Sequence, residues 1–189
     1  MDVVPDKRER ILAAAARLIV RNGLQCSMSA IAEEASVATG SLYNYFKNKE
    51  ELVLGVYVRV SMEMAESLML SDKATTSPEA DLASYIERYI DFIWDDAERA
   101  RLFDYLDNNP LISFDDAKAV FGPFVQHGIG LIEAAQASGA VREGLPTLIM
   151  SFMRGAIRNA LKRLRQNGSK LAPKDRRMIA DMCWAAIRR

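Results

Sequence analysis

Hydrophobic residues recur every three to four positions along almost the whole chain, and no stretch alternates between apolar and polar residues as a half-buried strand does. This pattern predicts an all-α protein of about nine helices, three short ones followed by longer ones. Pro123 and the Gly-Ile-Gly at 128–130 are expected to bend or interrupt one of the later helices. The breaks between the later helices are expected where Gly, Pro, Ser and Asn gather, at 71–78, 108–110, 138–144 and 166–173.

The first fifty residues carry the clearest start and stop signals. The first helix is expected to begin near Asp6, with Glu9 completing a capping box, and to end at the glycine of Asn22-Gly23. A second, short helix should follow Ser27, a favourable N-cap, and run to about Ala35.

A third helix and a long fourth helix are expected next. The third covers roughly Thr39 to Tyr45, and the fourth is capped by Asn48, with Glu51 reaching back to it, and extends to about Leu70. The two short helices joined by Ser36-Val37-Ala38, after a longer supporting helix, form a helix-turn-helix pattern.

The third helix has two kinds of face. Leu42 and Phe46 are four residues apart, so they share a face that anchors this helix to Ile31 and the first helix. The other side chains are therefore left for contact with DNA, and the leading end of the helix is expected to enter the major groove.

The stretch of about residues 8–53 resembles the TetR (tetracycline repressor) family of regulators. The resemblance rests on element order, on spacing and on the runs Ile11-Leu12-Ala13-Ala14-Ala15, Gly23, Ser27 to Ala35 and Gly40 to Leu52. It implies a DNA-binding domain at 1–48 and a ligand-binding and dimerisation domain at 49–189. The sequence departs from the family in two places: Ser36 stands where a glycine is usual, and Ala38 stands where a serine cap is usual.

Each residue expected to contact DNA has a reason in its chemistry. Asn44 suits an adenine edge, Thr39 and Ser41 suit either base type, and Gly40 lets the backbone approach closely. The tyrosine and serine hydroxyls and the Lys49 ammonium group suit phosphates. The alternatives are a purely capping Ser27, tyrosines that simply pack, an Asn44 that is merely solvated and an ordinary surface lysine. The expected DNA-binding set is Ser27, Ser29, Thr39, Gly40, Ser41, Tyr43, Asn44, Tyr45 and Lys49.

Charge limits where nucleic acid can bind. The chain of 189 residues has no net charge, but 51–141 holds 6 Lys and Arg against 16 Asp and Glu, whereas 142–189 holds 12 against 3. The acidic middle would repel phosphates, so only a local part of the molecule can contact DNA. The basic residues Arg158, Lys162, Arg163 and Arg165 are interpreted as a solvated face.

The last two helices are apolar over an arc too wide for one neighbour, which indicates self-association. One face can cover the protomer's own core while the other meets a twofold partner, and the resemblance likewise implies a dimer built from these two helices. Two fully internal helices in a monomer are the alternative. The expected interface residues are Phe152, Ala156, Ala160, Leu164, Met178, Met182 and Trp184.

The middle of the chain is rich in aromatic residues, which suit a small, largely apolar effector. Plain core packing is the alternative for these residues, and a structural or exposed role is the alternative for His127. The candidate ligand-binding residues are Tyr57, Met62, Tyr85, Tyr89, Phe92, Phe103, Phe121, Phe124, His127 and Phe152.

The sequence thus predicts a homodimeric, cytoplasmic regulator that a small molecule releases from operator DNA. A constitutive helix-turn-helix regulator and a helical enzyme are the rival classes. The enzyme has little support, because the sequence has one histidine and no catalytic motif. No cofactor or metal is expected, because Cys26 and Cys183 lie far apart in the sequence and have no ligand spacing. No apolar stretch reaches the roughly 18 residues that a membrane span needs.

Overall fold

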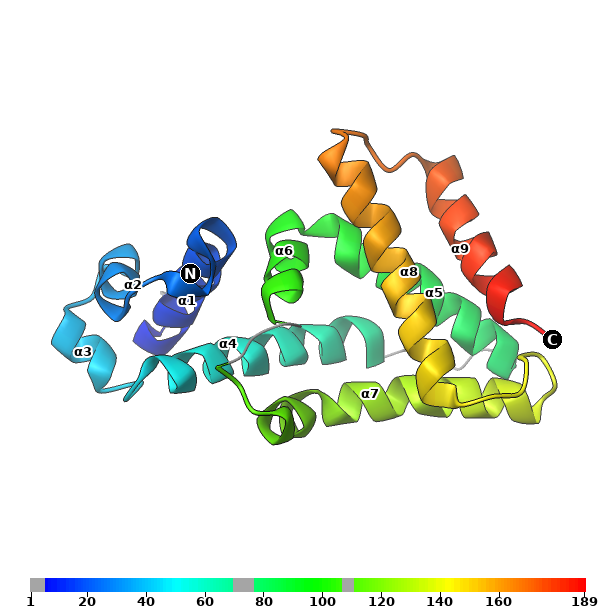
Figure 1. The fold of residues 1–189 in the computed structure, drawn as a ribbon, viewed down its shortest axis with the longest axis horizontal. Helices are drawn as coiled ribbons and strands as arrows, with labels where there is room; N and C mark the ends of the chain where they lie inside the picture. The colour runs from blue at the N-terminus through cyan, green and yellow to red at the C-terminus, as the bar shows by residue number, and fades with distance from the viewer. Residues whose placement is uncertain (1–5, 70–76, 107–110) are drawn as a thin grey trace, which may run out of the picture. The chain divides into compact units, whose positions relative to one another are not determined.

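The computed structural model describes residues 6–69, 77–106 and 111–189. In these residues the chain forms nine α-helices, as the hydrophobic periodicity predicts, together with a 3₁₀ turn η1, a π-helical segment η2 and one isolated β-bridge (Figure 1). The elements are α1 (Lys7–Asn22), η1 (Gly23–Gln25), α2 (Met28–Glu34), α3 (Thr39–Tyr43), α4 (Lys49–Met64), η2 (Ala65–Met69), α5 (Pro78–Asp95), α6 (Ala97–Leu106), α7 (Phe114–Ala137), α8 (Pro146–Gln166) and α9 (Pro173–Ile187). The expected end of the fourth helix at Leu70 and the expected breaks at 71–76 and 108–110 lie outside the described residues.

One compact unit groups Met1–Glu63 with Glu98–Gly122. In it α1 packs against α2, and Leu12 of α1 lies beside Gly55 of α4. Gly55 of α4 allows the close approach, because a Cβ there would lie 2.9 Å from Leu12 Cδ2 and 3.1 Å from Phe46 Cε1. The start of α4 therefore packs as part of the N-terminal unit.

The other unit groups Met64–Ala97 with Pro123–Arg189. Here α5, α8 and α9 pack against one another, and α8 and α9 run antiparallel (Figure 1). The backbone N–H of Arg142, before α8, donates to the carbonyl of Ile187 at the end of α9 over 3.0 Å. This bond closes the open end of the helical hairpin.

The sequence missed the break between α5 and α6. Asp96 adopts an extended conformation (φ −128°, ψ 105°), and Arg165 of α8 donates to the carbonyls of Ile93 and Trp94, which α5 leaves unpaired at its C-terminus. The Arg165 guanidinium also lies over the Trp94 ring, 4.7 Å from its centroid. Arg165 is thus a helix cap and not part of a solvated face, which corrects the sequence interpretation.

The expected interruption at Pro123 is wrong, because α7 runs through it and through the glycines at 128 and 130. A proline removes the hydrogen bond to the carbonyl four residues earlier, which belongs to Ala119. Ala119 and Pro123 are both exposed, so water can serve that carbonyl. The helix continues because the carbonyl that loses its hydrogen bond is on the solvent-exposed face.

Two of the expected helix caps are confirmed and one is wrong. Ser27 accepts a hydrogen bond from the Ala30 N–H (3.1 Å), and Asn48 accepts one from the Glu51 N–H (2.8 Å). The Glu51 carboxylate accepts from the Lys47 N–H instead of reaching back to Asn48. Asp6 makes no side-chain cap hydrogen bond, so the first predicted capping box does not form.

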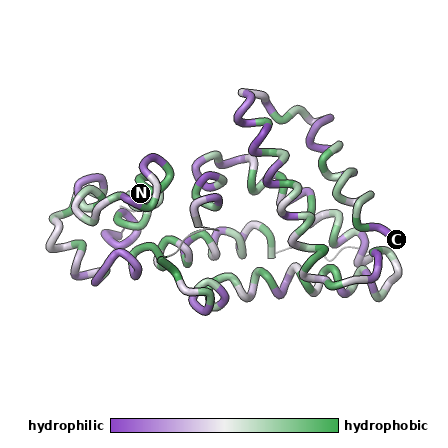
Figure 2. Tube along the Cα trace, in the orientation of Figure 1, coloured by the Kyte–Doolittle hydropathy of each residue, from purple (hydrophilic) through white to green (hydrophobic). Residues whose placement is uncertain are grey.

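Hydrophobic and hydrophilic residues are interspersed along the helices, so the helices are amphipathic and not apolar throughout (Figure 2). Within the described ranges, no helix combines the length and the apolar character required to cross a bilayer.

Candidate nucleic-acid interface and effector site

The turn of the helix-turn-helix is built around Ser36. Its N–H donates to the carbonyl of Glu33, and the N–H of Val37 donates to that of Ala32, both over 2.9 Å. These two bonds form a Schellman motif, which requires a left-handed residue at its centre. Ser36 has φ 54° and, among the described residues, is the only non-glycine with positive φ. The serine therefore keeps the left-handed conformation at a position where the family usually has glycine.

The segment after the turn has the two-faced character that the sequence predicts. Leu42 is fully buried and Phe46 is 2% exposed, so these two side chains hold the segment on the domain. Tyr43 and Tyr45 remain 49% and 37% exposed, although both are large and aromatic. Thr39, Gly40 and Asn44 are exposed as well, Ser41 is half-buried, and no atom lies within 4 Å of a Cβ built on Gly40.

Helix α3 is shorter than expected and lacks a side-chain cap. It ends at Tyr43 instead of Tyr45, and Ala38 occupies the N-cap position without a side-chain hydrogen bond. An N-cap hydroxyl would accept a hydrogen bond from one of the free N–H groups of the first turn. Those N–H groups are left for water or a ligand.

The two serines at the start of α2 form one small polar group. The Ser27 and Ser29 hydroxyl oxygens are 2.9 Å apart, and both side chains are exposed. Ser27 thus performs the capping role that the sequence offers as the alternative to phosphate contact. Both hydroxyls still face solvent, so phosphate contact stays a prediction.

Lys49 has a partner inside the protein. Its ammonium group donates to the carbonyl of Leu24 in η1, which ties the start of α4 to the segment before α2. Burial raises the pKa of the nearby Cys26 thiol, and the Lys49 charge offsets part of that rise. Lys49 is only half-buried, so its role at a phosphate also remains a prediction.

The aromatic candidates for an effector site fall into the two units. In the N-terminal unit, Tyr57 and Phe121 meet edge to face with centroids 5.7 Å apart, Phe103 is buried, and Met62 is 61% exposed. The other unit holds the remaining candidates, of which Tyr85, Tyr89, Phe92 and Phe124 are buried, His127 is half-buried and Phe152 is 56% exposed. The exposure of Met62 and Phe152 places both side chains at the protomer surface.

Arg154 of α8, which is not among the residues that the sequence indicates, organises the aromatic cluster of the second unit. Its Nε donates to the Tyr85 hydroxyl over 2.7 Å, and its guanidinium carbon lies 3.9 Å from the centroid of the Phe124 ring. The ring centroids of Tyr85 and His127 are 6.2 Å apart. A Cβ on Gly128 would lie 2.4 Å from an Arg154 nitrogen, so a glycine at 128 leaves room for that guanidinium.

Titration in this cluster follows burial and positive charge. Burial raises the pKa of Tyr85, with Arg154 and Arg88 opposing part of the rise. Burial also lowers the pKa of His127, and Arg88 and Arg154 lower it further. At neutral pH the phenol keeps its proton and His127 is uncharged, so the charge of the cluster comes from the two arginines.

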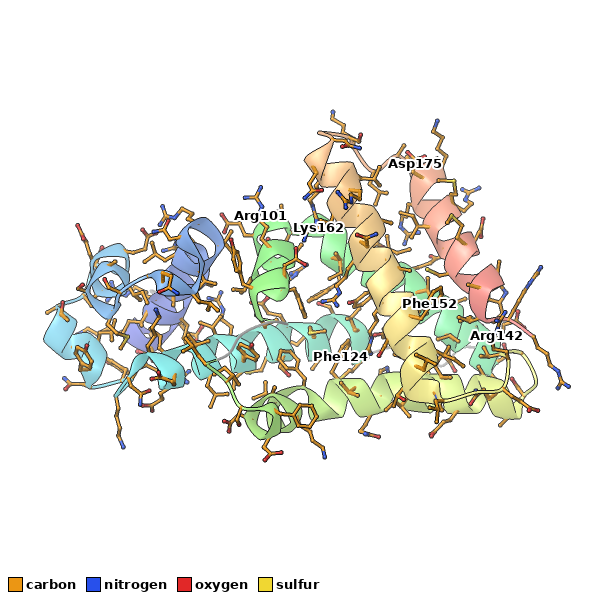
Figure 3. All side chains as sticks on the ribbon, viewed as in Figure 1. Arg101, Phe124, Arg142, Phe152, Lys162 and Asp175 are labelled. Atoms are coloured by element: carbon orange, nitrogen blue, oxygen red, sulfur yellow. The ribbon has the colours of Figure 1, made fainter. Side chains whose placement is uncertain are left out.

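Helices α8 and α9 each have an inner and an outer apolar face. Met153 and Ile157 of α8 and Ile179 and Cys183 of α9 are buried. The outer faces leave large apolar side chains 54–69% exposed, with Phe152 on α8 labelled in Figure 3: Leu145, Leu148, Phe152, Met178 and Met182. Along α9 a shallow groove of about 440 Å³ is lined by Lys174, Arg177, Met178, Asp181, Met182 and Ala185.

The predicted interface residues lie largely on these outer faces. Phe152, Ala156, Met178 and Met182 are exposed, whereas Ala160, Leu164 and Trp184 are half-buried. On α9 the exposed Met178 and Met182 lie on the outer face, whereas Ile179 and Cys183 are buried on the inner face. Leu145 and Leu148 were missed, because they precede the apolar run that predicts the interface.

Among the described residues no cluster of three or more His, Cys, Asp or Glu could hold a metal ion. Both cysteines are buried and free, and burial raises the pKa of Cys183 to about 11.

Three comparisons agree with this architecture. The family of bacterial regulatory proteins, tetR family, matches residues 11–56. An uncharacterised HTH-type transcriptional regulator of Haemophilus influenzae is 52% identical over 62 residues, which are 32% of this chain and 33% of that protein. The aligned part therefore spans about a third of this curated relative.

Solved structures resemble the whole chain. A TetR-family transcription regulator from Shewanella sp. PV-4 superposes with a TM-score of 0.87 at 22% identity, covering 98% of this chain and 100% of that one. The FadR regulator of Bacillus subtilis in complex with stearoyl-CoA gives a TM-score of 0.76 at 24% identity, covering 94% and 95%. These likenesses show the fold. The family match thus covers the helix-turn-helix at residues 11–56, and the whole chain shares the fold of solved TetR-family structures.

Proposed function

We propose that this protein is a homodimeric transcription regulator that binds operator DNA and is released by a small-molecule effector. The observation that carries the proposal is the segment from Thr39 to Tyr45, held on the domain by buried Leu42 and Phe46 while its polar and aromatic side chains stay exposed. Exposed tyrosines, an open glycine and uncapped N–H groups together suit a DNA groove and its phosphates.

Residues 1–48 are proposed as the DNA-binding part, and 49–189 as the effector-binding and dimerisation part. The outer apolar faces of α8 and α9 support dimerisation, because five large apolar side chains in water are the pattern of an unoccupied protein interface. A twofold dimer would present two recognition segments, and operator binding requires them about 34–36 Å apart.

The effector is proposed to act by changing that separation. Operator affinity and effector affinity are then linked, so each ligand weakens the other by the same factor. FadR of Bacillus subtilis, which shares the fold, was solved with stearoyl-CoA. This relative supports an effector that has both a large apolar part and charged groups.

The DNA-binding role can be tested on a duplex selected from a random pool, with affinity measured by fluorescence anisotropy at several salt concentrations. We expect Lys49→Ala to weaken binding to all duplexes and to lower the salt slope by about one unit, because one phosphate contact is lost. Since Lys49 also holds the Leu24 carbonyl, the melting temperature of the variant is measured alongside. Lys170→Ala, in the exposed loop before α9, is the control and should keep the slope.

An unchanged salt slope would assign Lys49 to structure alone. Failure of the unmodified protein to select any duplex would overturn the proposed function itself.

The effector-linked release is tested by thermal shift against a metabolite panel, followed by DNA titration with each compound that binds. We expect a saturating effector to weaken operator binding, typically by 5–150-fold. Equal affinity with and without a saturating effector would instead favour a constitutive regulator.

A further inference from the structure

A group of hydrogen-bond donors without matching acceptors lies in the effector-binding part of the chain. Tyr85 and Arg88 are three residues apart on α5 and therefore neighbours on one face of that helix. Arg154 of α8 donates to the Tyr85 hydroxyl, and His127 of α7 lies beside the Tyr85 ring. Three helices thus bring two guanidinium groups, a phenol and an imidazole together.

The donors of this cluster are not all used. Arg88 Nη1 is buried and has no hydrogen-bond partner among the described residues, and Arg88 Nε reaches only the Ser84 carbonyl at 3.4 Å. The Tyr85 hydroxyl accepts from Arg154, but no described acceptor takes its own proton, although Tyr85 is fully buried. A buried polar group left unpaired destabilises the folded state, and native proteins seldom carry one without a reason.

The positive charge of the cluster is also uncompensated. Neither Arg88 nor Arg154 forms an ion pair with any described residue; Arg154 is held by the Tyr85 hydroxyl, the Phe124 carbonyl and aromatic rings. Both arginines are half-buried, and charges withdrawn from water are normally matched by carboxylates. Among the described residues, no carboxylate supplies that match.

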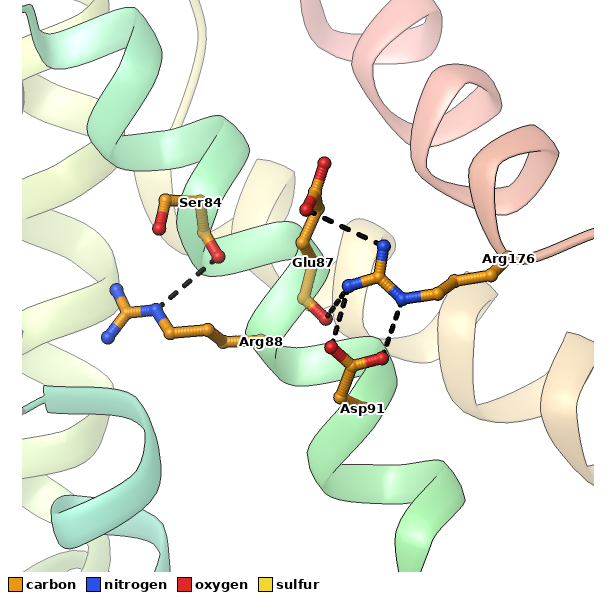
Figure 4. Close-up of polar contacts among 5 residues, drawn as sticks. All are labelled: Ser84, Glu87, Arg88, Asp91 and Arg176. Carbon is orange, nitrogen blue, oxygen red and sulfur yellow. Dashed lines mark hydrogen bonds and ion pairs between the residues drawn. The ribbon is translucent and has the colours of Figure 1, made fainter. Parts of the chain in front are cut away.

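The nearby carboxylates of α5 are engaged elsewhere. Arg176 of α9 forms two 2.6 Å hydrogen bonds to the carboxylate of Asp91 and a 3.5 Å ion pair with Glu87. Figure 4 shows the Arg88 guanidinium extending away from this network. Glu87 and Asp91 thus pair with α9, and neither forms an ion pair with Arg88.

We propose that Arg88, Arg154 and Tyr85 form the recognition point for an oxyanion, a carboxylate or a phosphate, on an effector whose apolar part packs on the surrounding aromatic side chains. Two guanidinium groups and a phenol proton supply charge-assisted hydrogen bonds to such a group. Phe124 and Tyr89, both buried beside the cluster, supply the apolar contacts. This proposal rests on the proposed function, because it names the chemical class of the effector.

The test uses three probes with the same tail: dodecanoate, dodecyl phosphate and dodecanol. Calorimetric binding is measured on the full-length protein without DNA, so the result does not depend on operator recognition. We expect at least one oxyanion to bind ten-fold or more tightly than dodecanol. The better of the two oxyanions tells a carboxylate effector from a phosphate one.

Three variants locate the site. Arg88→Met should reduce oxyanion affinity at least ten-fold while leaving the ligand-free melting temperature unchanged or higher, because it removes a half-buried charge that has no ion-pair partner among the described residues. Tyr85→Phe keeps the ring and removes the donor, so it should also weaken the oxyanions but not dodecanol. Arg142→Gln removes an exposed charge near the C-terminal end of α9 and should change nothing (Figure 3).

Equal binding of all three probes, binding of none, or wild-type oxyanion affinity in Arg88→Met would each overturn the proposal. If the protein nevertheless binds a selected duplex, the proposed regulator function stands and only the effector class is wrong. Intact oxyanion binding by a protein that selects no duplex would instead leave the anion site standing and overturn the regulator function.

Discussion

At the scale of single residues, the turn of the helix-turn-helix shows how a sequence can keep a geometry that its side chain disfavours. Ser36 takes the left-handed conformation because the Schellman hydrogen bonds from Ser36 and Val37 fix it there. The same Schellman motif ends α7 and α8, where the left-handed residue is a glycine, Gly139 or Gly168. The cost at Ser36 is borne by the rest of the domain.

We expect Ser36→Gly to stabilise the protein by up to about 1 kcal/mol, because a left-handed non-glycine residue costs about 1–2 kcal/mol and glycine loses part of that gain to chain entropy. Urea denaturation measures the change. Ser36→Val, with a branched Cβ, should move stability in the opposite direction. A glycine variant less stable than the original would show that the Ser36 side chain makes a contribution beyond its backbone.

At the scale of elements, α1 and α2 are joined by a small ion-pair network. Arg17 Nε donates to Glu34 Oε1 over 3.0 Å, and Arg21 donates to Oε2 over 2.5 Å. These hydrogen bonds from Arg17 and Arg21 hold the pKa of Glu34 below its usual value of 4.5. The carboxylate thus links the supporting helix to the first helix of the DNA-binding motif.

A lowered folded-state pKa means that the contribution of Glu34 is present above about pH 4.5 and is lost as the pH falls through the lower folded-state value. We expect Glu34→Gln to lower the melting temperature by a few degrees at most at pH 7, and less at high salt, because the pair is near solvent. The difference from the original protein should shrink at acid pH.

The exposed neighbour Glu33, whose side chain has no such partners among the described residues, provides the matched variant Glu33→Gln. Equal effects of the two substitutions at pH 7 would argue that the network adds nothing to stability.

Local signals explain which elements could be predicted. The caps at Ser27 and Asn48 and the Leu42–Phe46 anchor involve residues three or four apart, so the sequence shows them directly. The end of α5 depends on Arg165, 71 positions beyond Trp94, and no local pattern announces it. The sequence instead suggested a bend or interruption at Pro123, where solvent exposure makes a proline tolerable.

The same difference between local and long-range contacts applies to the candidate sites. The residues proposed to contact DNA lie between Ser27 and Lys49 and are predicted by local spacing, whereas Arg88 and Arg154 are far apart in sequence and approach the same Tyr85 side chain only through the fold. Aromatic content pointed to Tyr85, Phe124 and His127, but nothing in their pattern indicated an excess of positive charge. Unpaired donors become visible only when the neighbours of each atom are known.

At the scale of the whole molecule, the outer faces of α8 and α9 predict a dimer. We expect Phe152→Glu to convert the protein to monomers of unchanged melting behaviour at low concentration, because Phe152 is 56% exposed in the protomer and its loss leaves the core intact. Light scattering after size exclusion measures the mass. An interface that buried this position would have to desolvate an unpaired carboxylate, which costs several kcal/mol.

Phe114, at the start of α7, is 81% exposed and provides the control. Phe114→Glu should leave the mass unchanged. A dimer that survives Phe152→Glu would place the interface on a different surface.

The bidentate pair between Arg176 and Asp91 gives α5 and α9 a mechanical coupling (Figure 4). Arg88 and Asp91 lie three residues apart on α5. If α5 rotated about its axis when an anion bound to Arg88, the Asp91 carboxylate would move with the helix. Because two parallel hydrogen bonds resist rotation as well as separation, α9 must follow or the pair must break. The outer face carrying Met178 and Met182 would then move with α9, so in the proposed dimer an anion bound beside Arg88 would act on the subunit interface.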